Sequence, residues 1–494
     1  MVDAASRRLE FAGDGRGRRS TTDQGCNGTP NEPWRCHGCV HAGITSLVPL
    51  VAAMSLGFTS PALETMKGRV LVGGQYRQVP QELAIFKRAG GNSHDANAVA
   101  DWFSSLINFG ALLGALFSGW LCSRVGQRNV MLLSLVFIAM CWACAAFATA
   151  PWQLCAARIP MGLGVGLQSV AAPSLLKEFA PPSLRGTYGT AISAAIVLGV
   201  LLVDFLGGSV VRSGVHGEFC QWRQLAILVS LSALTVAGAA LPLLRQSPLA
   251  PLPATPAPTR RLACRDDGTA FFGRLRHPAE ALPHWRLLLA GFIPMVLQQL
   301  GGINAIMFFC QDILEDAHVK SYNLSGLLVV LMQLMGILVA AVLVERLGRR
   351  PLLLLSSTGM ALSSAALSIM LQGKRPPVDG VVGCLCLFSF LFALGLGPVP
   401  WLLIPELTGL PKQHRIRLAS FATACNWACS FIVTGAPLTA VQVRWGLSGV
   451  FALFSGISLT GAVLMALLVP ETAVRTANGR QMARLVTPEA VDHR

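Results

Sequence analysis

The chain has 494 residues, of which 53% are hydrophobic and only 13% are charged. Soluble globular domains carry about 25% charged residues, so the composition excludes a string of soluble domains and predicts an integral membrane protein. The net charge of +15 does not indicate nucleic-acid binding, because the basic residues stand between apolar runs and form no single patch with aromatic residues.

The first half of the chain is predicted to be a short tail followed by a helical bundle. Residues 1–40 are polar, with many arginines and glycines, and predict a disordered cytosolic tail, not a secretory signal. Residues 41–245 then hold six apolar runs, each near the roughly 20 residues that a helix needs to cross a bilayer. These predicted spans lie at about 41–62, 98–121, 129–149, 152–176, 188–210 and 223–245.

The second half repeats this arrangement after a polar break. Residues 246–284 are rich in proline and arginine and predict a mobile cytosolic linker. Residues 285–470 are predicted to form a second six-helix bundle, and residues 471–494 a second cytosolic tail. The spans lie at about 285–313, 322–346, 350–372, 379–408, 415–440 and 446–470. The sequence thus predicts an all-α membrane protein with twelve transmembrane helices.

The distribution of lysine and arginine predicts that both termini face the cytosol. With the N-terminus inside, 27 of the 39 basic residues fall in inside segments and 11 in outside segments, which is the bias seen in membrane proteins. No sorting signal indicates which membrane holds the protein, so the plasma membrane and endomembranes both stay open.

Three landmarks recur at matching places in the two halves. The second span is followed by SRVGQR at 123–128, and the eighth span is followed by ERLGRR at 345–350. The fourth and tenth spans each end in a glutamate with an arginine a few residues later, and the sixth and twelfth each end beside a proline. Matches in this order predict a duplicated six-helix unit.

Acidic and basic side chains gather at the predicted cytosolic ends of the spans. They could bridge the two halves in one conformation and part in another, as a gate requires; for the arginines, simple anchoring at the inner surface is the alternative. Interfacial ion pairs are weak when wet and stronger when partly buried. The predicted gate residues are Arg124, Glu178, Arg185, Glu345, Arg349, Arg350, Glu406, Arg415 and Glu471.

Amide side chains within the apolar spans predict a binding site. An amide in a membrane helix is costly unless it faces a wet cavity or bonds to another helix. Amides both donate and accept hydrogen bonds, and an aromatic ring packs against the C–H face of a pyranose, so such a set suits a sugar. The predicted sugar-binding residues are Gln298, Gln299, Asn304, Gln333, Trp401 and Asn426. Hydrogen bonding between helices is the alternative for each amide.

Charged residues within the predicted spans are few, and Asp204 and Arg158 stand out among them. Asp204 could be a proton site, but a place near the outer end of its span is the simpler expectation. Arg158 is expected to pair with a helix end or an acidic residue. We predict no enzyme active site, metal centre or cofactor. Cys26 with the Cys-His-Gly-Cys segment at 36–39 could bind zinc, although S-acylation or plain exposure suits a position beside a span better.

Residues 41–475 resemble the sugar-porter family of the major facilitator superfamily, within its facilitative glucose-transporter group. The nearest branch in that resemblance holds intracellular hexose transporters and insect-type trehalose transporters. The resemblance implies two six-helix bundles that rock about a central sugar site. The segments that carry it are QQLGGIN at 298–304, ERLGRR at 345–350, GPVPW at 397–401 with Glu406, PET at 470–472, EFAPPSLRG at 178–186, and WFSSLINFGALLG at 102–114 with TSP at 59–61.

The resemblance also implies a mechanism. Proton-coupled members carry an aspartate in the first span where this chain has Thr59, so facilitated uniport of a hexose such as glucose or fructose is predicted. Ser193 stands where the family usually has a sugar-contacting glutamine and is added to the predicted sugar-binding residues. The expected partners are the sugar and membrane lipid, with the monomer as the working unit and no nucleic acid.

Three alternatives stay open. One is a proton-coupled sugar or polyol transporter, and another is a trehalose transporter. The third is a non-transporting sugar sensor, which is suggested by departures from the family at Ser193, Ala393, Ser430 and the RQSPL segment at 245–249.

Overall fold

The structure, a computed structural model, is almost entirely helical in the part of the chain that it describes. The described residues are 33–59, 62, 66, 69–72, 75–78, 85–86, 93–179, 185–212, 222–245, 283–316, 322–373, 376–406 and 412–471.

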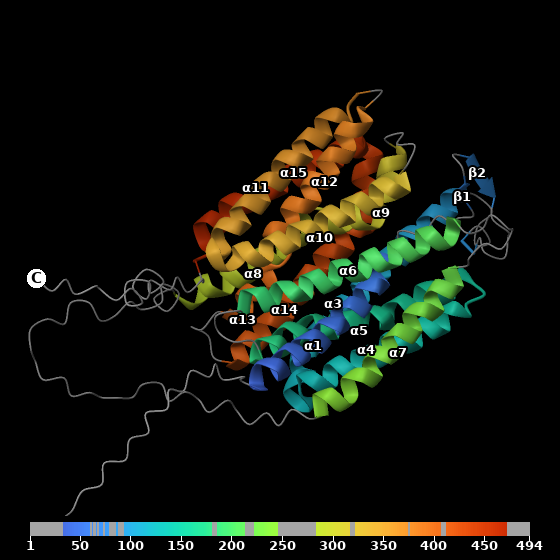
Figure 1. Cartoon of the computed structure of the whole chain (residues 1–494). Coiled ribbons are helices and arrows are strands. Elements are labelled where there is room, and N and C mark those ends of the chain that lie inside the picture. The colour runs from blue at the N-terminus through green and yellow to red at the C-terminus, as the bar shows by residue number, and fades with distance from the viewer. Residues whose placement is uncertain are drawn as a thin grey trace, which may run out of the picture.

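The helices form two groups that lie side by side (Figure 1). The first group consists of α1 (Pro33–Gly57), α3 (Ser93–Val125), α4 (Gln127–Ala146), α5 (Pro151–Phe179), α6 (Arg185–Arg212) and α7 (Trp222–Arg245). The second consists of α8 (His284–Leu300), α9 (Ile303–Asp316), α10 (Tyr322–Arg346), α11 (Arg349–Met370), α12 (Val378–Leu394), α13 (Val399–Glu406), α14 (Lys412–Thr434) and α15 (Ala436–Leu468). One buried apolar cluster lies mainly in the first group, with Ala424 and Trp427 of α14 joining it, and a second cluster lies in the second group.

The described helices are long and apolar enough for a membrane protein. Eleven helical stretches meet the length and hydropathy needed to cross a bilayer, and the shorter apolar stretch Thr45–Gly57 of α1 joins them. The pairs α8–α9 and α12–α13 each form one stretch, Trp285–Phe308 and Val378–Ile404. The predicted all-α fold is therefore confirmed, with apolar helices at all twelve predicted places.

A small hairpin is the exception to the predicted all-α fold. Strands β1 (Arg69–Val72) and β2 (Gln75–Gln78) pair antiparallel, with Arg69 opposite Gln78. The hairpin lies at one end of the molecule, which we call the hairpin end (Figure 1). The strands are four residues each, too short for an alternating pattern to mark them in the sequence.

The eleventh span ends earlier than predicted, whereas the predicted start of the twelfth span coincides with a break in the helix. The break between α14 and α15 lies at Gly435, which is extended, and Pro437 stands in the first turn of α15, where proline is tolerated because its N–H is not needed. α15 is interrupted at Gly446, whose φ of 70° is not helical, so a separate helical stretch begins where the twelfth span was predicted to start. Apolar residues continue past Gly435, so hydropathy alone extended the eleventh span beyond its true end.

Glycines hold α3 and α5 close together. Gly110 and Gly114 of α3 face Gly162 and Gly166 of α5, and a Cβ on any of the four would collide with a backbone carbonyl of the other helix. Both pairs have the small-xxx-small spacing that lets membrane helices approach closely.

Candidate functional site

A cavity lies between the two groups of helices. The first group contributes α1, α5 and α6 to its walls, and the second contributes α8, α9, α10, α12, α13 and α14. It encloses about 1100 Å³, with the open space at its mouth included. Interfaces between helical bundles and between domains are common places for small-molecule sites.

A break in the seventh span positions the main cluster of amides. Gly302 has a φ of 96°, and its lack of a Cβ lets the ring of Phe454 pack directly against it. The break separates α8, which carries Gln298 and Gln299, from α9, which carries Asn304. All three amides face the cavity.

Gln298 is bound by the broken tenth span. Its Nε2 donates to the carbonyls of Leu396 at 2.6 Å and Gly397 at 2.9 Å, between α12 and α13. Four residues after Leu396 comes Pro400, which has no N–H to donate. Gln298 therefore supplies a donor that the interrupted helix lacks, and its orientation is fixed.

Asn426 lies behind the two glutamines. It is fully buried and is not among the residues that face the cavity. Its Nδ2 donates to Gln298 Oε1 at 2.8 Å and to Met295 O at 2.6 Å, while its Oδ1 accepts from Gln299 Nε2 at 3.1 Å. The structure thus places Asn426 as a support for both glutamines.

Two of the predicted amide side chains, those of Gln299 and Gln333, hold an oxygen at the cavity that has no described partner. In the part of the chain that the structure describes, Gln299 Oε1 and Gln333 Oε1 are buried and accept no hydrogen bond. An unsatisfied buried acceptor costs about 1–3 kcal/mol. Asn304 differs, because its Nδ2 donates to Ser430 Oγ at 2.6 Å. The two free oxygens can accept hydrogen bonds from a ligand that carries hydroxyl groups.

The remaining predicted residues also face the cavity. Trp401 lies half-buried on α13, and Ser193 lies buried on α6. Gln168 of α5 and Trp427 of α14 were not predicted from the sequence, but they line the same cavity. Gln168 carried the same signal as Gln298, an amide within an apolar span.

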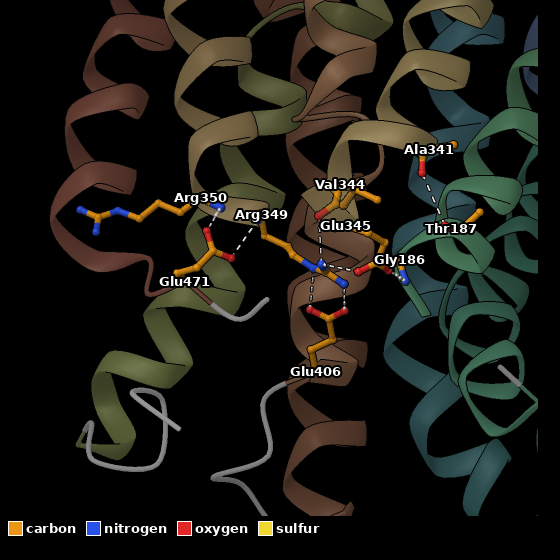
Figure 2. A network of polar contacts seen from close by, with 9 residues as sticks. All are labelled: Gly186, Thr187, Ala341, Val344, Glu345, Arg349, Arg350, Glu406 and Glu471. Carbon is orange, nitrogen blue, oxygen red and sulfur yellow. Dashed lines mark hydrogen bonds and ion pairs between the residues drawn. The ribbon is translucent and has the colours of Figure 1, made fainter. Parts of the chain in front are cut away.

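An ion-pair network joins the end of α10, the start of α11 and the end of α13 (Figure 2), and α13 lies at the end of the molecule opposite the hairpin (Figure 1). Arg349, with 5% of its side chain exposed, pairs with Glu406 at 2.8 Å and with Glu345 at 3.1 Å. Its Nε also donates to Glu406 at 3.2 Å, so the guanidinium binds that carboxylate with two nitrogens. A bidentate pair of this kind is strong and geometrically specific.

Glu345 links this network to the first group of helices. Its second carboxylate oxygen accepts from the backbone N–H of Gly186, in the first turn of α6, at 2.7 Å. Free N–H groups and the helix dipole make a helix N-terminus favourable for a carboxylate. Beside it, Thr187 Oγ1 donates to Ala341 O at 3.5 Å (Figure 2). The predicted bridge between the halves is therefore a side chain bound to a helix end.

Glu471 binds the start of α11 through the backbone. It accepts from the N–H groups of Arg349 at 2.9 Å and Arg350 at 3.2 Å. The Arg350 side chain turns away from the ion pairs and donates to Ala466 O (Figure 2).

The remaining predicted gate residues are Arg124, Arg415, Glu178 and Arg185. Arg124 is exposed and its guanidinium lies over the Trp120 ring, 5.5 Å from the centroid. Arg415 is half-buried near the start of α14. The side chains of Glu178 and Arg185 lie outside the described residues.

Arg158 is buried against the end of α1. Its guanidinium donates to Ser55 O at 2.9 Å and to Thr59 Oγ1 at 3.1 Å, and lies 3.8 Å from the centroid of the Phe103 ring. A cation near a helix C-terminus is stabilised by the helix dipole. The expected pairing of Arg158 with a helix end is confirmed.

Asp204 and the possible zinc ligands were also singled out from the sequence. Asp204 is partly exposed on α6, and its Oδ1 has no hydrogen-bond partner among the described residues. Within the same residues, no group of three potential metal ligands is found. Cys26 and the side chains at 36–39 lie outside the description.

Known proteins match most of the chain. The family model for "Sugar (and other) transporter" matches residues 72–249 and 274–481. A mouse protein, solute carrier family 2, facilitated glucose transporter member 8, is 30% identical over 478 residues, covering 87% of this chain and 91% of that protein. The facilitated trehalose transporter Tret1 of Culex quinquefasciatus is 28% identical over 463 residues, covering 86% and 82%.

Solved structures match the fold. The proton:xylose symporter XylE, a major facilitator superfamily protein bound to 6-bromo-6-deoxy-D-glucose, superposes with a TM-score of 0.70 at 18% identity. The match covers 89% of this chain and 97% of that one. An inward-open structure of the xylose transporter XylE from E. coli gives a TM-score of 0.64 at 18% identity, covering 91% and 99%. These likenesses establish the major facilitator fold.

Proposed function

This chain belongs to the sugar-porter family of the major facilitator superfamily, whose members are transporters and not enzymes, and from that premise we propose that it carries a hexose such as glucose or fructose by facilitated uniport. The single observation that carries this proposal is the amide-lined cavity between the two groups of helices. Gln299 and Gln333 each present a buried oxygen without a described partner, which suits a ligand rich in hydroxyl donors.

Trp401 supports a ring-shaped ligand. Its indole lies on the cavity wall near these amides, and an aromatic face packs well against the C–H face of a pyranose. Apolar residues of α1 and α6 line much of the wall on the other side. A few polar groups on a mostly apolar wall are typical of a specific small-molecule site.

The environment of Arg158 supports uniport over proton coupling. Thr59 stands where the proton-coupled members carry an aspartate, and its hydroxyl accepts a hydrogen bond from Arg158. A threonine hydroxyl does not ionise at physiological pH, so it cannot take up and release a proton as a carboxylate does. Among the described residues, no carboxylate contacts the Arg158 guanidinium.

The network around Arg349 supports alternating access. Glu345 joins the two groups through a contact that can form and break, since it depends on one hydrogen bond to Gly186. A gate of this type needs a reversible contact worth only a few kcal/mol. We further propose that this end faces the cytosol, as do both termini, that the protein resides in the plasma membrane or an endomembrane, and that it works as a monomer.

Uptake into vesicles tests the proposal. Purified protein in liposomes should take up radiolabelled glucose or fructose with saturable kinetics, and a protonophore should leave the rate unchanged. Trehalose and a polyol belong in the same panel, because a facilitated trehalose transporter is among the relatives. Uptake that requires a proton gradient would overturn uniport, and preference for trehalose would overturn the hexose assignment. Sugar binding without flux would identify a sensor.

A further inference from the structure

The two walls of the cavity differ in their polar groups. The second group of helices presents Gln298, Gln299, Asn304 and Gln333. The first group presents a wall that is apolar except for Gln168, Ser169 and Ser193. A sugar has hydroxyl groups on all sides, so a site with donors and acceptors on one wall only would leave hydroxyls unsatisfied on the other.

Gln168 is built into the cavity wall. It lies on the face of α5 that also carries Val165, Ser169 and Ala172 toward the cavity, at the three- and four-residue spacing of one helix face. The whole residue is only 4% exposed. Its side chain is thus enclosed within the protein at the surface of the cavity and does not face lipid.

Gln168 Oε1 has no partner within the described part of the protein. This oxygen is buried and accepts no hydrogen bond. Amides in membrane helices usually bond to a neighbouring helix, as Gln298 does to the Leu396 carbonyl. Burial removes water from Gln168 Oε1, and no neighbouring helix that the structure describes supplies a hydrogen bond in its place. A buried polar atom without a partner needs an explanation, and a bound ligand is one.

The two serines on this wall cannot take the place of Gln168 as a contact for a ligand. Ser169 donates its hydroxyl proton to Val165 O of its own helix at 2.7 Å. Ser193 on α6 has a side chain two bonds long from Cα to oxygen, so it reaches less far into the cavity than a glutamine amide. Gln168 is therefore the long polar side chain with which the first group can reach a ligand, among the residues the structure describes.

We propose that Gln168 is the sugar-binding residue of the first group of helices, with its Oε1 accepting a hydrogen bond from a hydroxyl of the sugar that Gln299 and Gln333 hold from the second group. The proposal rests on the proposed transport function and assigns a specificity-determining contact to α5. A sugar bound by both groups at once favours the conformation in which they close on it, because a ligand shifts a conformational equilibrium only through differential contacts.

The test uses Gln168→Met, which keeps the side-chain length and removes the amide. In liposomes, the variant should raise the half-saturation concentration for the transported hexose by roughly tenfold, as expected for one lost hydrogen bond to substrate. The same change at an exposed position, Gln442→Met, is the matched control and should leave transport unchanged. A set of deoxyhexoses, each lacking one hydroxyl, is measured in parallel.

The deoxy sugars separate a contact from a structural role. The parent protein should discriminate against the analogue that lacks the hydroxyl bound by Gln168, and Gln168→Met should lose that discrimination while keeping the others. An equal loss for every sugar, or no loss, would overturn the proposal. If Gln168→Met does not reach the membrane, Gln168→Asn, with its shorter reach, must show the same selective loss. Absence of uptake by the parent would instead overturn the transport function itself.

Discussion

At the scale of single residues, the buried amides divide into two kinds. Asn426 and Gln298 are satisfied by other parts of the protein, and their hydrogen bonds fix the break between α12 and α13 and the face of α8. Gln299 and Gln333 keep an oxygen free at the cavity. Satisfied groups give the site its shape, and unsatisfied groups give it affinity for hydroxyls, because a ligand restores the hydrogen bonds that burial removed.

Trp401 provides the first test at this scale. Trp401→Ala should lower the uptake of the transported hexose by about tenfold or more, because a stacked ring contributes roughly 0.5–1.5 kcal/mol beyond its buried area. The measurement is uptake at a fixed amount of protein in the membrane. Trp152, which is 68% exposed at the start of α5, is the control, and Trp152→Ala should retain uptake. Equal loss in both variants would contradict a specific role for Trp401.

Asn426 should matter although it does not face the cavity. Asn426→Ala removes the donor to Gln298 Oε1 and the acceptor for Gln299 Nε2. Two buried amides then lose partners at a cost of about 1–3 kcal/mol each, so the half-saturation concentration should rise and the melting temperature in detergent should fall. Asn129→Ala, at an exposed asparagine bonded to Val125 O, should change neither. An Asn426→Ala protein with unaltered affinity would show that the glutamines hold their places alone.

Some residues of the site could be predicted from the sequence and others could not, because they differ in how clearly the sequence marks them. Gln298, Gln299 and Asn304 stand out because three amides crowd one apolar span, and all three face the cavity. Gln168 is also an amide within an apolar span, but it stands alone there, and a single amide is a weaker indication of a binding site. The support role of Asn426 depends on how α14 packs against α8, and a single sequence carries no such contact.

At the scale of helices, close packing of α3 on α5 depends on glycine. Gly162→Ala places a Cβ against Ile107 O of α3, and the helices must separate. The expected cost is about 1–3 kcal/mol, as for other overpacked sites, seen as a lower melting temperature in detergent. A Cβ at Gly238 of α7 would stand in open space, with no neighbouring group within 4 Å, so Gly238→Ala should be neutral or slightly stabilising. Equal changes in melting temperature for Gly162→Ala and Gly238→Ala would show that helix propensity, and not packing, determines the effect of the substitution.

The helices were predictable because apolar runs of membrane length are a strong signal. The breaks within these helices were harder to predict. The break at Gly302 requires a positive φ and a close ring of Phe454, and the break at Gly435 lies within continuous apolar sequence. Gly126 and Gly348, with φ values of 85° and 97°, immediately precede α4 and α11 at matching places of the two halves, which agrees with the predicted duplication.

At the scale of the whole molecule, the two groups of helices touch near both ends. At the end with the Arg349 network, Glu345 accepts from Gly186 N. Toward the hairpin end, Asn108 Nδ2 of α3 donates to Thr434 Oγ1, at the last residue of α14, at 2.8 Å, and both residues are buried. A transporter that alternates between two openings must break one of these contacts at a time, so they should oppose each other energetically.

Weakening either contact should therefore open the end at which it lies. Thr434→Val removes the acceptor for Asn108 and should shift the population toward opening at the hairpin end by about tenfold, the value of one net hydrogen bond. Glu345→Gln exchanges a charged hydrogen-bond acceptor for a weaker neutral one and should shift the population toward opening at the end with the Arg349 network. Distances between spin labels placed across the groups at each end measure both shifts. Thr460→Val, which loses only a bond to Gly456 O within α15, should move neither distance. Shifts in the same direction for Thr434→Val and Glu345→Gln would show that the two contacts do not form opposing gates.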